Sequence, residues 1–125
     1  MEILGLIFDC DGTLTDSMPL HYIAWREVLG RHGIAFDEDR FYSLGGMPTD
    51  MIIAMLAEET GTKLDPLAVA HEKEQAFLGS MHLLEEIPAI TQIVREQRGR
   101  LKMAVASGGF RNVITRQLRQ LRLSD

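Results

Sequence analysis

The sequence predicts an α/β fold in which a parallel sheet carries a large helical insertion. Two near-continuous apolar segments, Ile3 to Phe8 and Leu101 to Ala106, have the character of strands that are covered on both faces. The apolar residues between and after these segments recur with helical spacing. The predicted order is therefore strand, four-helix insertion, helix, strand and helix.

Each predicted helix of the insertion begins after a residue whose side-chain oxygen can accept hydrogen bonds from the first backbone N–H groups. These N-capping candidates are, in chain order, Asp16 or Ser17, Asp37, Thr49 and Asp65. Pro19 and Pro66 suit the first turns of the first and fourth helices. Gly33 and Gly61 are expected to end the first and third helices.

Two more helices flank the second strand. One follows Ile87-Pro88 and ends at Gly99, and the other carries apolar residues at helical spacing from Phe110 to Leu121. Two strands are few for a parallel sheet, which normally needs further strands to protect its edges. We therefore expect the chain to be the front part of a longer α/β domain.

The composition is that of an ordinary globular protein with an acidic balance. The 125 residues carry a formal net charge of −5, which argues against a general nucleic-acid binder. Eight of the thirteen basic residues nevertheless lie in the last thirty-one positions. They form either a solvated basic face or a surface that meets acidic partners.

The single cysteine, Cys10, cannot form an internal disulfide, which suits a reducing compartment. Strand alternation turns its side chain toward the core and away from the aspartates on either side. The first residues lack the basic segment of a signal peptide, and no apolar segment approaches the ~20 residues of a membrane span. We expect a soluble, cytoplasmic protein whose partners include neither nucleic acid nor membrane.

The most informative feature is a pair of aspartates directly after the first strand. Asp9 and Asp11 are two residues apart, so their side chains can converge on one small volume. Asp9 could attack a phosphorus atom, and Asp11 could protonate the leaving oxygen and later activate water. Mg²⁺ is the natural counter-ion for such a pair. Gly12 permits the turn that brings backbone N–H groups near a phosphate.

A second candidate segment, Ser107-Gly108-Gly109, follows the second strand. The carboxyl ends of neighbouring parallel strands meet at one edge of a sheet, so this segment is expected beside the aspartates. The Ser107 hydroxyl and the Gly108 N–H group suit a phosphate oxygen.

His21 and Trp25 lie one helical turn apart, just past the aspartate loop. They are either packed residues of a partly buried helix face or a pair that contacts a substrate at the mouth of the site.

Taken together, these residues resemble the haloacid dehalogenase superfamily of phosphohydrolases. The string from Asp9 to Leu14 is similar to that family's first motif, and Ser107 matches its second. Asp16-Ser17, His21, Trp25 and the segment Gly46 to Thr49 resemble the branch of β-phosphoglucomutase and fructose-1-phosphate phosphatase-like enzymes.

The resemblance implies a partial Rossmannoid core, residues 1–15 and 86–125, with an all-helical cap domain at residues 16–85 inserted into it. It implies that Asp9 is the nucleophile, that Asp11 is the general acid and base, and that both hold Mg²⁺. The residues that would bind the transferring phosphoryl group are Gly12, Ser107 and Gly108. The residues that would face the substrate from the cap are His21, Trp25, Gly46, Met47 and Thr49.

Two departures from the family pattern shape the expected function. Thr49 stands where the mutase branch has an arginine, which favours a phosphatase for a small sugar phosphate over a phosphosugar mutase. The family also needs a lysine and further acidic residues, but no lysine follows Lys102 and only Asp125 is acidic after Ser107. We therefore expect a chain that is truncated and weakly active alone, with an exposed apolar edge at Ile3 to Phe8.

Two alternatives remain open besides the phosphatase. One is a β-phosphoglucomutase-like mutase, and the other is a non-catalytic fragment or interaction module. The expected partners are a small phosphorylated molecule and either the missing half of the core or a second copy of the chain.

Overall fold

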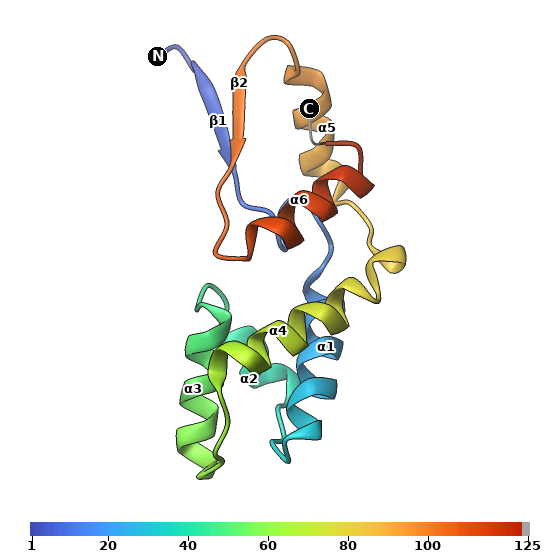
Figure 1. Ribbon diagram of the computed structural model, residues 1–125. Coiled ribbons are helices and arrows are strands. Elements are labelled where there is room, and N and C mark those ends of the chain that lie inside the picture. Colours follow the sequence, from blue (N-terminus) through green and yellow to red (C-terminus); the bar gives the residue numbers. More distant parts are fainter. Residues whose placement is uncertain (124–125) are drawn as a thin grey trace. The chain divides into compact units, whose positions relative to one another are not determined.

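The computed structural model describes residues 1–123, and its elements follow the order that the sequence predicts (Figure 1). The strands are β1 (Gly5–Phe8) and β2 (Lys102–Val105). The α-helices are α1 (Met18–Arg31), α2 (Glu38–Ser43), α3 (Thr49–Thr60), α4 (Pro66–Leu78), α5 (Pro88–Gln97) and α6 (Arg111–Gln120). A short 3-10 helix, η1, covers Met81–Leu83. The prediction of an α/β protein with a helical insertion is confirmed.

The chain divides into two compact units. One, the α/β unit, combines Met1–Met18 with Leu83–Asp125, and the other, the helical unit, is the continuous segment Pro19–His82. The aspartate loop and the Ser107 segment both belong to the α/β unit, whereas His21 and Trp25 belong to the helical unit.

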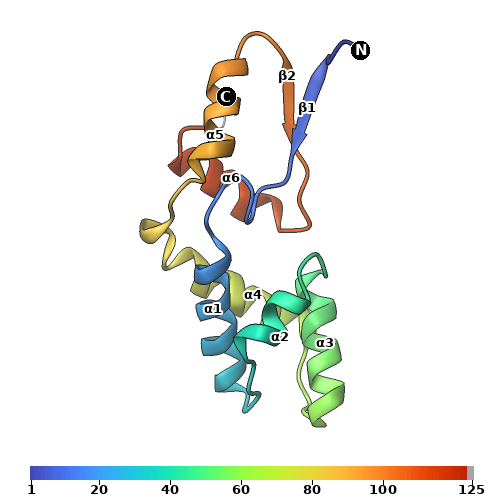
Figure 2. The same ribbon diagram turned by 180° about the vertical axis from the view of Figure 1, so that it is seen from behind.

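The two strands of the α/β unit pair in parallel, from Gly5 opposite Lys102 to Phe8 opposite Val105. They lie side by side in both views (Figures 1 and 2). Gly5 suits this close pairing, since a Cβ there would lie 3.0 Å from the Lys102 carbonyl oxygen. The pairing continues one residue beyond β2, where the Ala106 N–H group donates to the Phe8 carbonyl oxygen at 2.9 Å.

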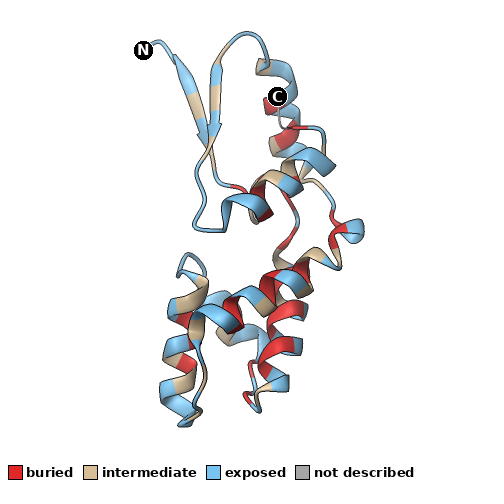
Figure 3. Ribbon diagram, in the orientation of Figure 1, coloured by how far each residue is buried: buried red, intermediate tan, exposed pale blue. Residues whose placement is uncertain are grey.

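Only one face of this sheet is covered by the described residues. The core of the unit is formed by buried residues of the aspartate loop, α5 and the segment after α6, namely Leu14, Val94 and Leu123. Half-buried strand residues pack against this core, among them Phe8, Met103 and Val105. The alternate strand residues are exposed, Ile7 by 76% (Figure 3). The expectation of strands covered on both faces is therefore wrong for the described structure. The exposed apolar edge expected at Ile3 to Phe8 is present, since among the described residues β1 pairs only with β2 and Ile3, Leu4 and Ile7 are exposed.

The helical unit is held by its own buried side chains. Helix α1 buries an apolar side through Leu20, Ala24, Trp25, Val28 and Leu29. Ile53 of α3 and Phe77 of α4 are fully buried. The unit therefore has a hydrophobic core that is separate from that of the sheet.

Two of the predicted helix caps are confirmed and one is wrong. The Asp37 carboxylate accepts from the Arg40 N–H group at 2.7 Å, and that of Asp65 accepts from Leu67 at 3.1 Å. Thr49, by contrast, is the first residue of α3, and Pro48 occupies the N-cap position without a side-chain hydrogen bond. The Pro48 carbonyl oxygen accepts from the Ile52 N–H group at 3.1 Å, so the first turn closes without the Thr49 hydroxyl.

Helix α3 ends where the sequence predicts. Gly61 has the left-handed backbone conformation, with φ 65°, that favours glycine at a helix C-terminus. The Thr62 N–H group then donates to the Ala57 carbonyl oxygen at 2.9 Å. Across residues 1–123 no helix combines the length and the apolar character that crossing a bilayer would require.

Candidate active site

The aspartate loop is a tight backbone structure at the end of β1. The Cys10 carbonyl oxygen accepts from three successive N–H groups, those of Thr13, Leu14 and Thr15, at 2.9–3.1 Å. The Gly12 N–H group donates to the Thr15 carbonyl oxygen at 2.8 Å. Gly12 has φ 79°, a conformation that residues with a Cβ rarely adopt. The turn expected at Gly12 is therefore present.

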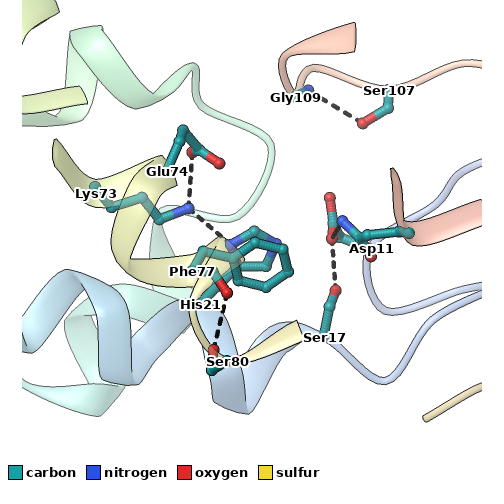
Figure 4. A network of polar contacts seen from close by, with 10 residues as sticks. Asp11, Ser17, His21, Lys73, Glu74, Phe77, Ser80, Ser107 and Gly109 are labelled. Atoms are coloured by element: carbon teal, nitrogen blue, oxygen red, sulfur yellow. Dashed lines mark hydrogen bonds and ion pairs between the residues drawn. The ribbon is translucent and has the colours of Figure 1, made fainter. Parts of the chain in front are cut away.

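Asp11 is held by two side-chain donors from opposite ends of the chain. Its Oδ1 accepts from the Ser17 hydroxyl at 2.5 Å (Figure 4). The same oxygen accepts from the Gln117 amide at 3.1 Å. Ser17 and Gln117 are both fully buried. The Thr15 hydroxyl donates to the Ser17 oxygen at 3.1 Å, which leaves the Ser17 proton for Asp11. These contacts fix the orientation of the Asp11 carboxylate.

Asp9 has a different environment from Asp11. It is exposed, and its Oδ1 accepts from the backbone N–H group of Cys10 at 2.9 Å. An exposed carboxylate that is oriented by backbone can meet a molecule arriving from solvent. The two carboxylates therefore differ in their exposure and in the groups that hold them.

Cys10, between the two aspartates, has its side chain in the core. It is fully buried, and its Sγ lies 3.9 Å from both the Thr15 hydroxyl and the Gln117 amide oxygen. Desolvation by burial, together with the negative charge of Asp11, raises the pKa of the thiol to about 12. The interpretation that Cys10 faces the core is confirmed, and its thiol is a poor nucleophile.

Ser107 and Gly108 follow β2, next to the strand that leads into the aspartate loop. The Ser107 hydroxyl oxygen accepts from the Gly109 N–H group at 3.1 Å (Figure 4). Both Ser107 and Gly108 are exposed, and α6 begins shortly after them with Phe110 at its N-cap position. The parallel pairing of β1 and β2 thus brings the Ser107 segment and Asp9 to the same edge of the sheet.

His21 and Trp25 are both buried in the helical unit. The His21 ring stacks on Phe77 with a centroid distance of 3.9 Å, and its Nδ1 lies 2.7 Å from the Lys73 Nζ (Figure 4). Trp25 packs edge-on against Phe36 at 5.6 Å. The structure thus places both residues as packed members of the unit, with His21 joined to a buried cation.

Lys73 and Glu74 complete this buried cluster, and the sequence analysis did not single them out. Lys73 is 3% exposed, and its Nζ lies 3.0 Å from the Glu74 Oε1 and 5.4 Å from the centre of the Trp25 ring. Within residues 1–123, the buried Glu74 Oε2 has no hydrogen-bond partner. Burying ionic groups costs free energy unless the groups are paired, so a buried lysine and glutamate are unusual on the packed face of a helix. Its sequence, His71-Glu72-Lys73-Glu74, has the charge alternation of an exposed face, which conceals the burial.

The remaining predicted substrate residues lie at the turn before α3. Gly46 has φ 89°, Met47 is 37% exposed, and Thr49 is half-buried. The Met47 N–H group donates to the Leu44 carbonyl oxygen at 3.1 Å, which closes the turn.

The Asp9 carboxylate and the backbone carbonyl oxygen of Asp11 are suitable ligands for a divalent cation. Mg²⁺ prefers oxygen ligands and is commonly bound through one or two carboxylates with waters and substrate phosphate. No group of three or more potential metal-ligating side chains occurs in the described part of the chain. The residues present therefore fit part of a magnesium site that water and phosphate oxygens would complete.

Comparison with known proteins decides the family. The sequence model of the haloacid dehalogenase-like hydrolases matches residues 6–125. The chain belongs to this family. The haloacid dehalogenase-like assignment agrees with the motifs from Asp9 to Leu14 and at Ser107.

Two curated relatives of this haloacid dehalogenase-like chain act on phosphorylated sugars, as their names state. Fructose-1-phosphate phosphatase YqaB of Escherichia coli is 43% identical over 106 residues, which cover 83% of this chain and 55% of the relative. A phosphorylated carbohydrates phosphatase of Thermotoga maritima is 31% identical over 124 residues, which cover 95% of this chain and 56% of the relative.

A solved structure supports the fold. A hydrolase from Pseudomonas syringae superposes with a TM-score of 0.83 and 27% identity, over 97% of this chain and 57% of that one. The chain therefore spans about half the length of the haloacid dehalogenase-like proteins it matches.

Proposed function

We propose that this chain carries the nucleophile and the acid–base group of a Mg²⁺-dependent phosphatase for a small sugar phosphate. The observation that carries the proposal is the contrast between the two aspartates of one loop. Asp9 is exposed and oriented by a backbone N–H group, while Asp11 is anchored by Ser17 and Gln117. The names of the two curated relatives support the sugar phosphate class.

In the first step, an Asp9 carboxylate oxygen attacks phosphorus and the bond from phosphorus to the sugar oxygen breaks. Asp11 donates its proton to that leaving oxygen, so the free sugar departs and an aspartyl-phosphate remains on Asp9. In the second step, Asp11 takes a proton from water, whose oxygen attacks phosphorus. The Asp9–phosphorus bond breaks and inorganic phosphate leaves. The hydrogen bonds to Asp11 keep the proton donor in place through both steps.

The transferring phosphoryl group would be bound by the other residues of the loop edge. The Ser107 hydroxyl and the Gly108 N–H group would donate to its oxygens, and the Gly12 turn would present further N–H groups. Mg²⁺ would be held by the Asp9 carboxylate and the Asp11 backbone carbonyl, and when bound it would supply positive charge that balances the phosphate.

The helical unit would act as the cap domain, for which residues 16–85 are the proposed bounds. His21, Trp25, Gly46, Met47 and Thr49 are the residues proposed to face the substrate. The bond from Lys73 to His21 would then fix the imidazole orientation. A cytoplasmic location fits the single buried thiol, since cytoplasmic proteins keep their cysteines reduced.

The test uses the 125-residue chain and an activated phosphoryl donor. Its turnover of sugar phosphates is expected to be weak, because no lysine follows Lys102 to balance the phosphate charge. An acyl phosphate such as acetyl phosphate needs less assistance, so with Mg²⁺ we expect intact mass to show one added phosphoryl group. Asp9→Asn should abolish this label, whereas Asp16→Asn, at an exposed aspartate of the same loop, should keep it.

Two results would overturn the proposal. One is an unlabelled wild-type chain, and the other is an Asp9→Asn variant labelled like the wild type. The products formed from hexose phosphates distinguish the alternative reaction. A phosphatase releases inorganic phosphate and free sugar, whereas a mutase returns an isomeric sugar phosphate.

A further inference from the structure

The exposed face of helix α6 and the turn after it carry four arginines, which we name the α6 row. Arg111, Arg116 and Arg119 are exposed, and Arg122 continues the row in the turn that follows the helix. The opposite side of α6 is buried through Val113, Ile114 and Gln117 (Figure 3). From Gln97 to Leu123 the sequence has no acidic residue, so nothing in this segment offsets the positive charge of the row.

Within residues 1–123, the four arginines of this row form none of the ion pairs that three other surface arginines form. Arg31, Arg40 and Arg95 each contact a carboxylate oxygen, at 2.6, 2.7 and 2.6 Å. For the four arginines of the α6 row, the structure of residues 1–123 contains no ion pair. Their charge is therefore available to a second molecule.

Stabilisation of the α6 C-terminus does not account for the row. Cations are favourable at a helix C-terminus, where they offset the helix dipole. Two arginines from α5 and the residue after it already contact the carbonyl groups at the end of α6. The Arg95 guanidinium donates to the Leu121 carbonyl oxygen at 3.2 Å, and that of Arg98 donates to the Arg122 carbonyl oxygen at 3.4 Å.

Arg122 also stands at a position where glycine is favoured. Its φ of 60° is the one positive value among the described residues other than glycine. A side chain in this conformation costs roughly 1 kcal/mol relative to glycine. The turn thus carries an arginine at a position where the backbone conformation alone would favour glycine.

We propose that Arg111, Arg116, Arg119 and Arg122 form a docking surface for a short acidic segment of a partner protein. Guanidinium groups match carboxylates with paired hydrogen bonds. From Arg111 to Arg119 the helical part of the row is about 12 Å long at ~1.5 Å per residue, which equals about four residues of extended peptide at ~3.3 Å each. The net charge of −5 repels long polyanions and anionic surfaces, which favours a short acidic peptide over nucleic acid or membrane.

The test measures binding of a fluorescent peptide of alternating glutamate and glycine, with a glutamine version as the uncharged control. Arg116→Gln with Arg119→Gln should weaken binding about tenfold, since two charge-assisted pairs of roughly 0.7 kcal/mol each are lost. The matched control is Arg26→Gln with Lys63→Gln, which removes the same charge from exposed residues of the helical unit. That control should stay within about twofold of the wild type.

A second double variant, Arg111→Gln with Arg122→Gln, should also weaken binding, because it removes the two ends of the same row. The proposal is overturned if the wild type does not bind the glutamate peptide, or if the control pair weakens binding as much as the α6 variants. It is equally overturned if an RNA oligonucleotide of equal charge binds more tightly than the peptide. Self-association that both α6 variants abolish would assign the surface to a second copy instead.

Discussion

The hydrogen bond from Ser17 to Asp11 gives the most direct test of how the Asp11 carboxylate is held. In a Ser17→Ala variant the Asp11 carboxylate loses its 2.5 Å donor and keeps the Gln117 amide at 3.1 Å. Hydrogen bonds to charged groups contribute about 1.5–3 kcal/mol. Asp11 is only half-buried, so water can partly replace the lost donor, and we expect the lower end, about 1.5 kcal/mol.

The measurement is urea unfolding at pH 7, followed by circular dichroism. A loss of about 1.5 kcal/mol corresponds to a drop of about 6 °C in Tm for a chain of this size. The matched control is Ser43→Ala, because the Ser43 hydroxyl also donates one 2.7 Å hydrogen bond but is exposed. It should change stability by less than ~0.5 kcal/mol.

The charge of Asp11 can be separated from its shape in the same experiment. In an Asp11→Asn background, Ser17→Ala should cost about half as much, because a neutral acceptor forms a bond roughly half as strong. The reasoning is refuted if Ser17→Ala is as stable as Ser43→Ala, or if its cost is unchanged in the Asp11→Asn background.

Three further changes test other parts of the structure. Burial raises the pKa of the Cys10 thiol to about 12, so a maleimide at pH 8 should label the folded chain at least ~100-fold more slowly than the chain in urea; equal rates would contradict this. Phe77→Ala leaves a cavity at a fully buried position and should lower the free energy of unfolding in urea by about 3–5 kcal/mol. Leu67→Ala, at a 58% exposed position, should lower it by less than ~1 kcal/mol. Similar unfolding midpoints for the two variants would contradict this prediction. A hydrogen bond from Arg95 lowers the pKa of Glu86 below its ordinary 4.5. The ionised Glu86 therefore stabilises the folded chain above pH 4.5, and this contribution is lost as the pH falls through the lowered pKa. Arg95→Gln should therefore shrink the stability difference between pH 7 and pH 3, and an unchanged difference would count against it.

The sequence was most informative where local pattern and chemistry coincide. An apolar strand followed by Asp9, Asp11 and Gly12 predicts both the loop and its turn, because strand alternation and the glycine conformation are local properties. The helix caps at Asp37 and Asp65 were predictable for the same reason. The Thr49 cap failed because Pro48, one residue earlier, already has a backbone conformation that begins the helix.

The features that escaped prediction depend on contacts between distant segments. Lys73 and Glu74 have the pattern of a solvated helix face, and only the packing of α1 against α4 buries them beside His21. Gln117 lies at a position of α6 where the helical spacing predicts an apolar residue. This polar residue on the buried side was the one sign in the sequence of a contact such as that with Asp11. The exposed face of the sheet likewise depends on which elements cover it, which hydrophobicity alone does not determine.

The contact between Gln117 and Asp11 also sets an order of events during synthesis. The two residues are 106 positions apart, so the ribosome adds Gln117 last among the groups that orient this carboxylate. At about 5–20 residues per second, Asp11 waits roughly 5–20 s for its second donor. The continuous segment Pro19–His82 is complete long before then and can fold first, since its contacts are local. A nascent chain can therefore gain its helical unit before the Asp11 carboxylate is held by both donors.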